Sequence, residues 1–251
     1  MLYNYLHDPS AIAGSLILVI AVSAAVLAPW ITPQNPYNLA EVSLEYFLTP
    51  PIWMEDGQAP FILGTDDQGR CIFSTIIYGC RTSLIVGFSV VLITGTFGVM
   101  MGLLTGYYGG KLDALIMRMA DTIYAFSTTL LALMFLGIFG KGSVLLVILA
   151  ICIAGWVRYA RTMRGSVLEI KQEAYIMAAK ATGAGDFRLL VRHLLPNAIP
   201  PIFVIVAVDL AVVIMIEATL SFLGVGVPLT EPSLGMMVAI GKNYVYAGMW
   251  W

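Results

Sequence analysis

The sequence predicts an all-α integral membrane protein, a polytopic helical bundle that crosses the bilayer five times. Of its 251 residues, 59% are hydrophobic and only 11% are charged, a composition that excludes a soluble globular domain. Several uncharged stretches reach the roughly 20 residues that a helix needs to cross the hydrocarbon core. Seven of the thirteen Lys and Arg residues lie between Arg158 and Arg192. Because short loops rich in Lys and Arg stay on the cytoplasmic face, this segment orients the chain.

Five apolar segments are expected to span the membrane: residues 11–31, 82–110, 115–140, 142–157 and 197–223. The first has no basic flank and no small-residue cleavage site, so it is expected to be a retained span and not a removed signal. The fourth is short and is expected to continue through Tyr159, with its arginines snorkelling towards the cytoplasm. Gly98, Gly102 and Gly106 repeat a spacing that favours close helix packing, either with a partner permease or, as we favour, within this chain.

The acidic residues complete the predicted topology. Residues 31–80 carry six acidic side chains against Arg70 alone, which places this loop outside and the amino end inside. The expected organisation has four parts. They are the N-terminal end with the first span (1–31), an extracytoplasmic loop (32–81), a core with a cytoplasmic loop at 165–196 (82–226), and a loop-like extracytoplasmic C-terminal segment (227–251).

The basic cytoplasmic loop has internal order. Residues 169–181 are rich in good helix formers, and Gly183-Ala184-Gly185 supplies a break that tolerates positive φ. Asp186 is expected to cap a second helix over 187–195, with the next boundary at Pro196. Two short helices that meet at a glycine corner form a compact knob, residues 169–195, suited to a cleft in another protein. The alternative is a basic amphipathic loop that rests on anionic lipid.

The spacing within this loop resembles a known motif. It runs Met177-Ala178-Ala179, three residues, Gly183, nine residues, His193, one residue, Leu195-Pro196. This is similar to the EAA loop of bacterial ABC importer permeases. Met177 stands where that family has glutamate, and Glu173, one turn earlier on the same helical face, is expected to supply the carboxylate.

Three further segments narrow the resemblance. Residues 63–70, which read Leu-Gly-Thr-Asp-Asp-Gln-Gly-Arg, resemble the second permease subunit of dipeptide, oligopeptide and nickel importers. So do the Gly-Tyr-Tyr-Gly-Gly of 106–110, whose aromatic pair suits a membrane interface, and the Glu-Ala-Thr-Leu-Ser-Phe-Leu-Gly-Val-Gly of 217–226. The resemblance implies the type I ABC importer permease fold, in which the family has six spans against the five found in this sequence.

The resemblance also implies partners and a coupling role. The ATPase-coupling loop would consist of Glu173, Met177, Ala178, Ala179, Gly183, Ala184, Gly185, Asp186, Leu195 and Pro196. No phosphate-binding Gly-x-x-x-x-Gly-Lys-Ser/Thr occurs in the sequence, so ATP and Mg²⁺ are expected on two partner ATPase subunits or domains, with no cofactor on this chain. The other expected partners are a second homologous permease, an extracytoplasmic binding protein and the lipid of the bacterial inner membrane, with no nucleic acid. The expected substrate is a short peptide, or else nickel or another small solute.

Three carboxylates fall at bilayer depth, where charge is costly and usually functional. Asp121, Asp209 and Glu217 are candidates to line or gate a path for a polar, cationic substrate. The structural alternative has Glu217 accepting hydrogen bonds near a helix break and Asp121 pairing with Arg118. A different class of function, a proton-coupled secondary transporter, would use the same carboxylates to carry protons, and a non-transporting scaffold would move no substrate. No catalytic residue or metal site is predicted.

Overall fold

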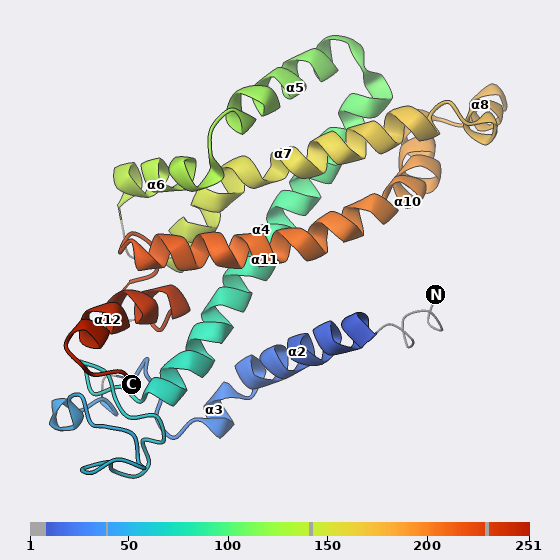
Figure 1. The fold of residues 1–251 in the computed structure, drawn as a ribbon. Coiled ribbons are helices and arrows are strands. Elements are labelled where there is room, and N and C mark those ends of the chain that lie inside the picture. Colours follow the sequence, from blue (N-terminus) through green and yellow to red (C-terminus); the bar gives the residue numbers. More distant parts are fainter. Residues whose placement is uncertain (1–8, 39, 141–142, 229–230) are drawn as a thin grey trace. The chain divides into compact units, whose positions relative to one another are not determined.

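The computed structural model describes residues 9–38, 40–140, 143–228 and 231–251, and this part of the chain is helical without a β-strand (Figure 1). The predicted start of the fourth span, at Gly142, lies outside the described residues. The elements in chain order are α2 (Pro9–Val26), α3 (Ala28–Ile31), η1 (Leu44–Tyr46), α4 (Ile72–Tyr108), α5 (Gly110–Tyr124), α6 (Thr128–Phe139), α7 (Val144–Ile170), α8 (Ala174–Ala181), α9 (Asp186–Arg188), η2 (Leu189–Leu194), α10 (Leu195–Ala198), α11 (Pro200–Phe222) and α12 (Leu234–Tyr246).

Four described helices, α2, α4, α7 and α11, are long and apolar enough to cross a membrane, and the bent pair α5 and α6 raises the number to five if it is one span. This agrees with the five predicted spans. The third of them, 115–140, is nevertheless not one straight helix, because α5 and α6 meet at an angle of 86°. The break falls at Ser127, whose extended backbone precedes α6.

The second predicted span begins too late. The helix α4 starts at Ile72, ten residues before Thr82, and its 37 residues extend about 55 Å. That length exceeds a hydrocarbon core of about 30 Å, so the helix projects beyond it. The irregular part of the predicted loop 32–81 therefore ends at residue 71, because charged Arg81 limits the apolar run without ending the helix.

One compact unit comprises the described parts of residues 1–85 and 217–251. In it, the loop between α3 and α4 is fastened to the start of α4, where the Gln34 side chain accepts from the Cys71 amide at 2.6 Å. The segment 227–251, expected to be loop-like, contains the 13-residue helix α12. Gly235 allows this helix to approach α11 closely, since a Cβ there would lie 2.1 Å from the Ala218 carbonyl oxygen.

The second compact unit comprises residues 86–216. Its centre is the packing of α4 against α7, which the glycine spacing predicted. A Cβ at Gly98 would lie 2.5 Å from the Trp156 carbonyl oxygen, and one at Gly102 would lie 2.4 Å from that of Ala160. The two backbones therefore meet closely within this chain, as predicted.

Candidate functional site

The knob, residues 169–195, begins with the last residues of α7. A turn at 171–173 divides the helix expected over 169–181, and the short helix α8 follows and ends at a glycine corner. Gly183 has a φ of +86°, the left-handed conformation that glycine adopts most readily. The Ala184 amide donates to the Ala179 carbonyl at 3.1 Å, and the Gly183 amide donates to that of Lys180 at 3.0 Å. This pair of bonds is the Schellman arrangement, which satisfies the last carbonyls of a helix. The predicted break at 183–185 is thus confirmed in position and conformation.

The second half of the knob differs from the prediction. Gly185, not Asp186, occupies the position before α9, and Asp186 is the first residue of that helix. A π-helical turn, η2, and the short α10 follow, so the expected single helix over 187–195 is three consecutive pieces. Pro196 lies in the first turn of α10, where its missing amide hydrogen costs no helical bond, and the chain turns at Ile199 instead.

A buried apolar cluster holds the knob to the ends of two spans. Four side chains of the knob enter it, and on the span side it takes residues of α4, α7 and the start of α11. The fully buried members from the knob are Ile176, Leu189, Leu190 and Leu194, and those from α4 and α7 are Leu103, Tyr107, Tyr159, Met163 and Val167. Burial of each such leucine or isoleucine stabilises the contact by about 2 kcal/mol. The knob is therefore a firm extension of these spans.

Tyr107, near the end of α4, joins the pieces with polar bonds. Its hydroxyl donates to the Asp186 carboxylate at 2.6 Å, and its carbonyl accepts from the Lys171 ammonium at 2.5 Å. Lys171 directly follows α7, so one residue of α4 is bonded to the end of α7 and to the knob. The sequence offered no sign of these bonds, because the Gly-Tyr-Tyr-Gly-Gly motif was interpreted as an interfacial aromatic pair.

The outer face of the knob is open and mixed in character. Phe187 is 79% exposed and Met177 is 58% exposed, and Tyr175, Glu173 and Lys180 are exposed beside them. Exposed large apolar side chains rimmed by charges are typical of protein interaction sites. Among the predicted coupling residues, Ala178, Gly183, Gly185, Asp186 and Pro196 are also exposed, whereas Ala179, Ala184 and Leu195 pack against the buried cluster.

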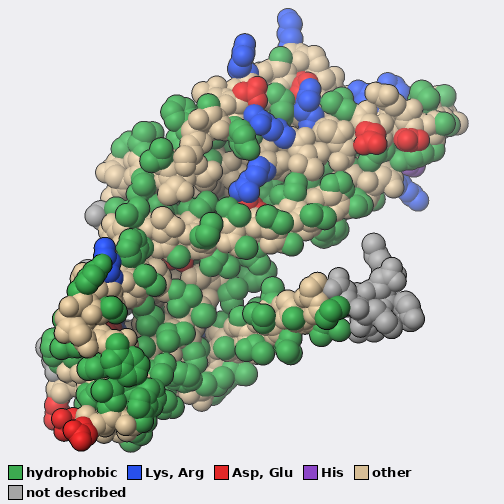
Figure 2. All heavy atoms as spheres, viewed as in Figure 1, with side chains coloured by type: hydrophobic (Ala, Val, Ile, Leu, Met, Phe, Trp, Pro, Cys, Tyr) green, Lys and Arg blue, Asp and Glu red, His purple; other side chains and the backbone are tan. Residues whose placement is uncertain are grey.

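Two ion pairs connect α5 to α7. Arg164 makes a two-pronged contact with Asp113 at 2.6 and 2.7 Å, and Arg161 pairs with Asp121 at 2.6 Å. The predicted partner of Asp121, Arg118, is therefore wrong, because α7 brings a guanidinium to that carboxylate from 40 residues away. Figure 2 shows the Lys and Arg side chains gathered over α5 and α7.

The other two carboxylates of the predicted path are buried within the chain. Asp209 is 1% exposed, forms an ion pair with Arg158, and accepts from the Tyr159 hydroxyl at 3.0 Å. Arg158, which was expected to snorkel, therefore pairs with a carboxylate of α11. In the present arrangement Asp209 offers no open surface to a substrate.

Glu217 is fully buried, and three serines donate to it. Ser83 of α4 lies at 2.8 Å, Ser221 of α11 at 2.8 Å, and Ser233, which precedes α12, at 3.0 Å. The structural alternative stated for Glu217, hydrogen bonding near a helix break, is the one observed. The break itself is at Gly224, whose φ is +70°.

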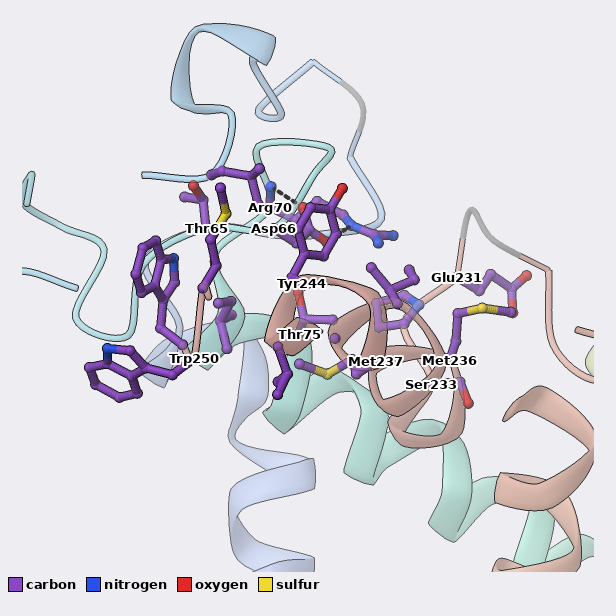
Figure 3. A pocket seen from close by; sticks show the side chains of 18 residues that line it. Thr65, Asp66, Arg70, Thr75, Glu231, Ser233, Met236, Met237, Tyr244 and Trp250 are labelled. Atoms are coloured by element: carbon purple, nitrogen blue, oxygen red, sulfur yellow. Dashed lines mark hydrogen bonds and ion pairs between the residues drawn. The ribbon is translucent and has the colours of Figure 1, made fainter. Parts of the chain in front are cut away.

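The loop between α3 and α4 and the helix α12 enclose a separate cavity of about 140 Å³ (Figure 3). Its charged lining consists of Asp66 and Arg70, which pair at 2.7 Å, and Glu231, and methionines and Trp250 supply much of the rest. Next to this pair, burial and the charge of Asp66 raise the pKa of the Asp67 carboxyl.

Comparison with known proteins identifies the family. The model of the binding-protein-dependent transport system inner membrane component matches residues 98–250, and that of the N-terminal transmembrane domain of oligopeptide transport permease C matches residues 1–51. The di/tripeptide transport system permease protein DppC of Pseudomonas aeruginosa is 37% identical over 247 residues, which cover 98% of this chain and 80% of that protein. The dipeptide transport system permease protein DppC of Bacillus subtilis is 35% identical over 241 residues, which cover 96% of this chain and 72% of that protein.

A solved structure supports the fold. An inward-facing form of the MetNI methionine ABC transporter aligns with a TM-score of 0.57 at 19% identity, covering 69% of this chain and 82% of that one. The predicted type I permease fold and a multi-pass location in the bacterial inner membrane are thereby confirmed. As a permease component the chain is a transport subunit and not itself an enzyme. The chain belongs to the family of binding-protein-dependent transport system inner membrane components.

Proposed function

We propose that this chain forms one half of the membrane pore of an ATP-driven importer of short peptides. The observation that carries the proposal is the knob, which presents exposed Met177 and Phe187 on a base fastened to α4 and α7. An open apolar face on a rigid mount suits a partner protein better than lipid headgroups. The peptide substrate is supported by relatives named for di/tripeptide or dipeptide transport, which align over 96–98% of this chain.

The partners follow from the family and the knob. A second, related permease would complete the pore, and an extracytoplasmic binding protein would deliver the peptide. Two ATPase subunits or domains would hold ATP and Mg²⁺ and receive the knob. When the ATPases close, the knob moves with them, and the bonds of Tyr107 to Asp186 and Lys171 carry that movement to the ends of α4 and α7.

The proton-coupled alternative receives less support from the described carboxylates. A proton carrier needs a carboxylate that water reaches in turn from each side. Glu217 is closed in by three serines, and Asp209 by Arg158 and Tyr159. Asp121 is open, but it pairs with Arg161 on the surface of the chain. These fixed partners favour a structural role and an external energy source.

The test is uptake by the purified complex in proteoliposomes. Radiolabelled dialanine is supplied with the binding protein, and ATP, ADP or a proton gradient alone is provided as the energy source. The proposal predicts uptake only with ATP and the binding protein. Uptake driven by the proton gradient alone would establish the secondary transporter instead, and transport of radioactive nickel without dialanine would establish the metal importer.

A further inference from the structure

A groove in the unit of residues 86–216 contains charge of one sign. It has a volume of about 380 Å³ and lies between α5, α7 and α11. Its lining is Tyr124, Arg158, Arg161, Thr162, Val204, Ile205 and Val208. Two guanidinium groups face this groove, and no carboxylate of the described chain lines it.

The position of Arg158 along the spans bears on what the groove can hold. Its partner Asp209 lies nine residues into the 23-residue α11, about 14 Å from the start of that helix along its axis. The Arg158 side chain is nevertheless 34% exposed. A guanidinium that touched lipid at this depth would be strongly disfavoured, so the exposed side of Arg158 fits an aqueous path through the pore.

The chemistry of the groove favours an anion. Guanidinium has five N–H donors, and Asp209 contacts Arg158 from the buried side through one of its nitrogens. Arg161 adds a second cation, placed 4.4 Å from the centre of the Tyr124 ring and held by Asp121. Arginine pairs with a carboxylate in a planar, two-pronged geometry. Of the Arg158–Asp209 pair, the guanidinium is the exposed partner and the carboxylate lies behind it.

We propose that Arg158 binds the terminal carboxylate of a short peptide as it passes through this groove, with Asp209 as the residue that positions the guanidinium. This inference rests on the proposed peptide transport. Every short peptide with a free C-terminus carries this group, so one fixed cation would serve substrates with different side chains.

The first experiment changes the charge chemically. The three native cysteines are first replaced, and Arg158→Cys is then combined with Asp209→Asn. The second substitution prevents the loss of Arg158 from leaving a buried carboxylate without its ion-pair partner. We expect loss of peptide uptake with normal assembly, and recovery when 2-aminoethyl methanethiosulfonate attaches an ammonium group. Methyl methanethiosulfonate, which is neutral, should restore nothing. Val208→Cys in the same background is the matched control, because it lines the same groove without charge and both reagents should affect it alike.

The second experiment tests the carboxylate. Uptake of dialanine is compared with uptake of dialanine amide, each at saturation of the binding protein. The measured quantity is the ratio of dialanine uptake to dialanine amide uptake. Because the binding protein is the same for every variant, its own preference between the two peptides cancels when the ratio for a variant is divided by the ratio for the parent. We expect Arg158→Gln with Asp209→Asn to lower this ratio about tenfold, the size of one charge-assisted hydrogen bond. Arg158→Lys, which keeps a charge beside Asp209 but loses the planar fork, should lower it less.

The outcomes separate the two proposals. An unreactive cysteine at position 158, equal recovery with the neutral reagent, or an unchanged uptake ratio would overturn the role of Arg158 while leaving peptide transport intact. Failure of the cysteine-free parent to import dialanine with ATP would instead contradict the proposed function itself.

Discussion

Tyr107 shows how much of the coupling geometry depends on one residue. Its hydroxyl reaches Asp186 in the knob, while its carbonyl receives Lys171 from the end of α7. The neighbouring Tyr108 is 53% exposed and packs edge-to-face on Tyr107 at 5.0 Å between ring centres. The two tyrosines therefore form a natural comparison, because only the first donates to the knob.

Tyr107→Phe is expected to weaken coupling without dismantling the complex. The substitution removes one hydrogen bond to a carboxylate, about 2 kcal/mol, and keeps the buried ring. The ratio of peptide imported to ATP hydrolysed should fall several-fold in proteoliposomes, with normal copurification of all subunits. Tyr108→Phe is the control and should leave the ratio unchanged. An unaltered ratio in both variants would show that the Tyr107 hydroxyl transmits nothing.

Asp67, in the loop that precedes α4, provides a test by pH. Burial and neighbouring Asp66 raise its folded-state pKa, so the folded chain binds this proton more tightly than the unfolded chain. The contribution of protonated Asp67 to the free energy of unfolding is fully present below the ordinary aspartate pKa of about 4. It is lost as the pH rises through the raised pKa of the folded chain. Asp67→Asn should therefore flatten the fall in melting temperature between pH 4 and 7. The exposed Asp56→Asn is the control, and the same flattening there would contradict the assignment.

Charged residues also show where sequence reasoning stops. The sequence allowed the prediction that Glu217 accepts hydrogen bonds near a helix break. A glutamate in an apolar span needs hydrogen-bond partners, and the glycines that follow it predict the break. Its three serines are 4, 16 and 134 residues away, and their convergence is a property of the fold. Asp121 likewise pairs with Arg161 and not with Arg118 because the fold places α7 beside α5, which the sequence alone does not show.

At the scale of elements, Glu217 attaches α12 to two spans. Ser83 belongs to α4, Ser221 to α11, and Ser233 precedes α12. Gly235 then lets α12 rest directly on the backbone of α11. A helix of 13 residues, too short to span the bilayer, is thereby fixed in place by one buried carboxylate.

Glu217→Ala should release α12. Three buried hydroxyl groups would lose their acceptor, and leaving such groups unsatisfied costs about 1–3 kcal/mol each. We expect a lower melting temperature and faster proteolysis within 227–246, while the knob stays protected. Glu55→Ala, which removes an exposed carboxylate of the same unit, is the control and should change neither. Unchanged proteolysis of α12 in Glu217→Ala would show that packing alone holds the helix.

The elements themselves were predictable to the extent that hydropathy controls them. The spans α2, α7 and α11 follow from apolar runs, although α7 continues to Ile170, well past the predicted end at 157, and the glycine corner of the knob follows from Gly183. The bend between α5 and α6 was missed because no proline or glycine marks residues 125–127. The helix α12 was missed because glycines and Lys242 interrupt its apolar pattern, so only packing on α11 reveals its place.

At the scale of the whole molecule, the predicted topology can be tested by labelling. With the native cysteines replaced, a cysteine at Gln58 should react with an impermeant thiol reagent in intact cells, and one at Lys180 should not. Both positions are exposed in the structure, so reactivity reports the side of the membrane and not burial. Labelling at position 180 alone would reverse the orientation and place the knob outside.

The central claim is that the knob couples ATP hydrolysis on partner chains to the movement of the spans. The glycine corner offers a matched pair of substitutions. Gly183 has a φ of +86°, which proline cannot adopt, whereas Gly185 has a φ of −67°, which proline prefers. A proline at position 183 would also remove the amide that donates to Lys180. The corner would then have to rearrange, while the buried cluster keeps the spans folded.

The decisive measurement is therefore ATP-driven dialanine uptake, assayed beside ATP hydrolysis and copurification of the ATPases, in Gly183→Pro and Gly185→Pro. The coupling account predicts that Gly183→Pro reaches the membrane, pairs with its partner permease, loses uptake and binds the ATPases loosely, while Gly185→Pro behaves as the parent. Normal uptake with firmly bound ATPases in Gly183→Pro would contradict it and leave the basic loop as an anchor on lipid.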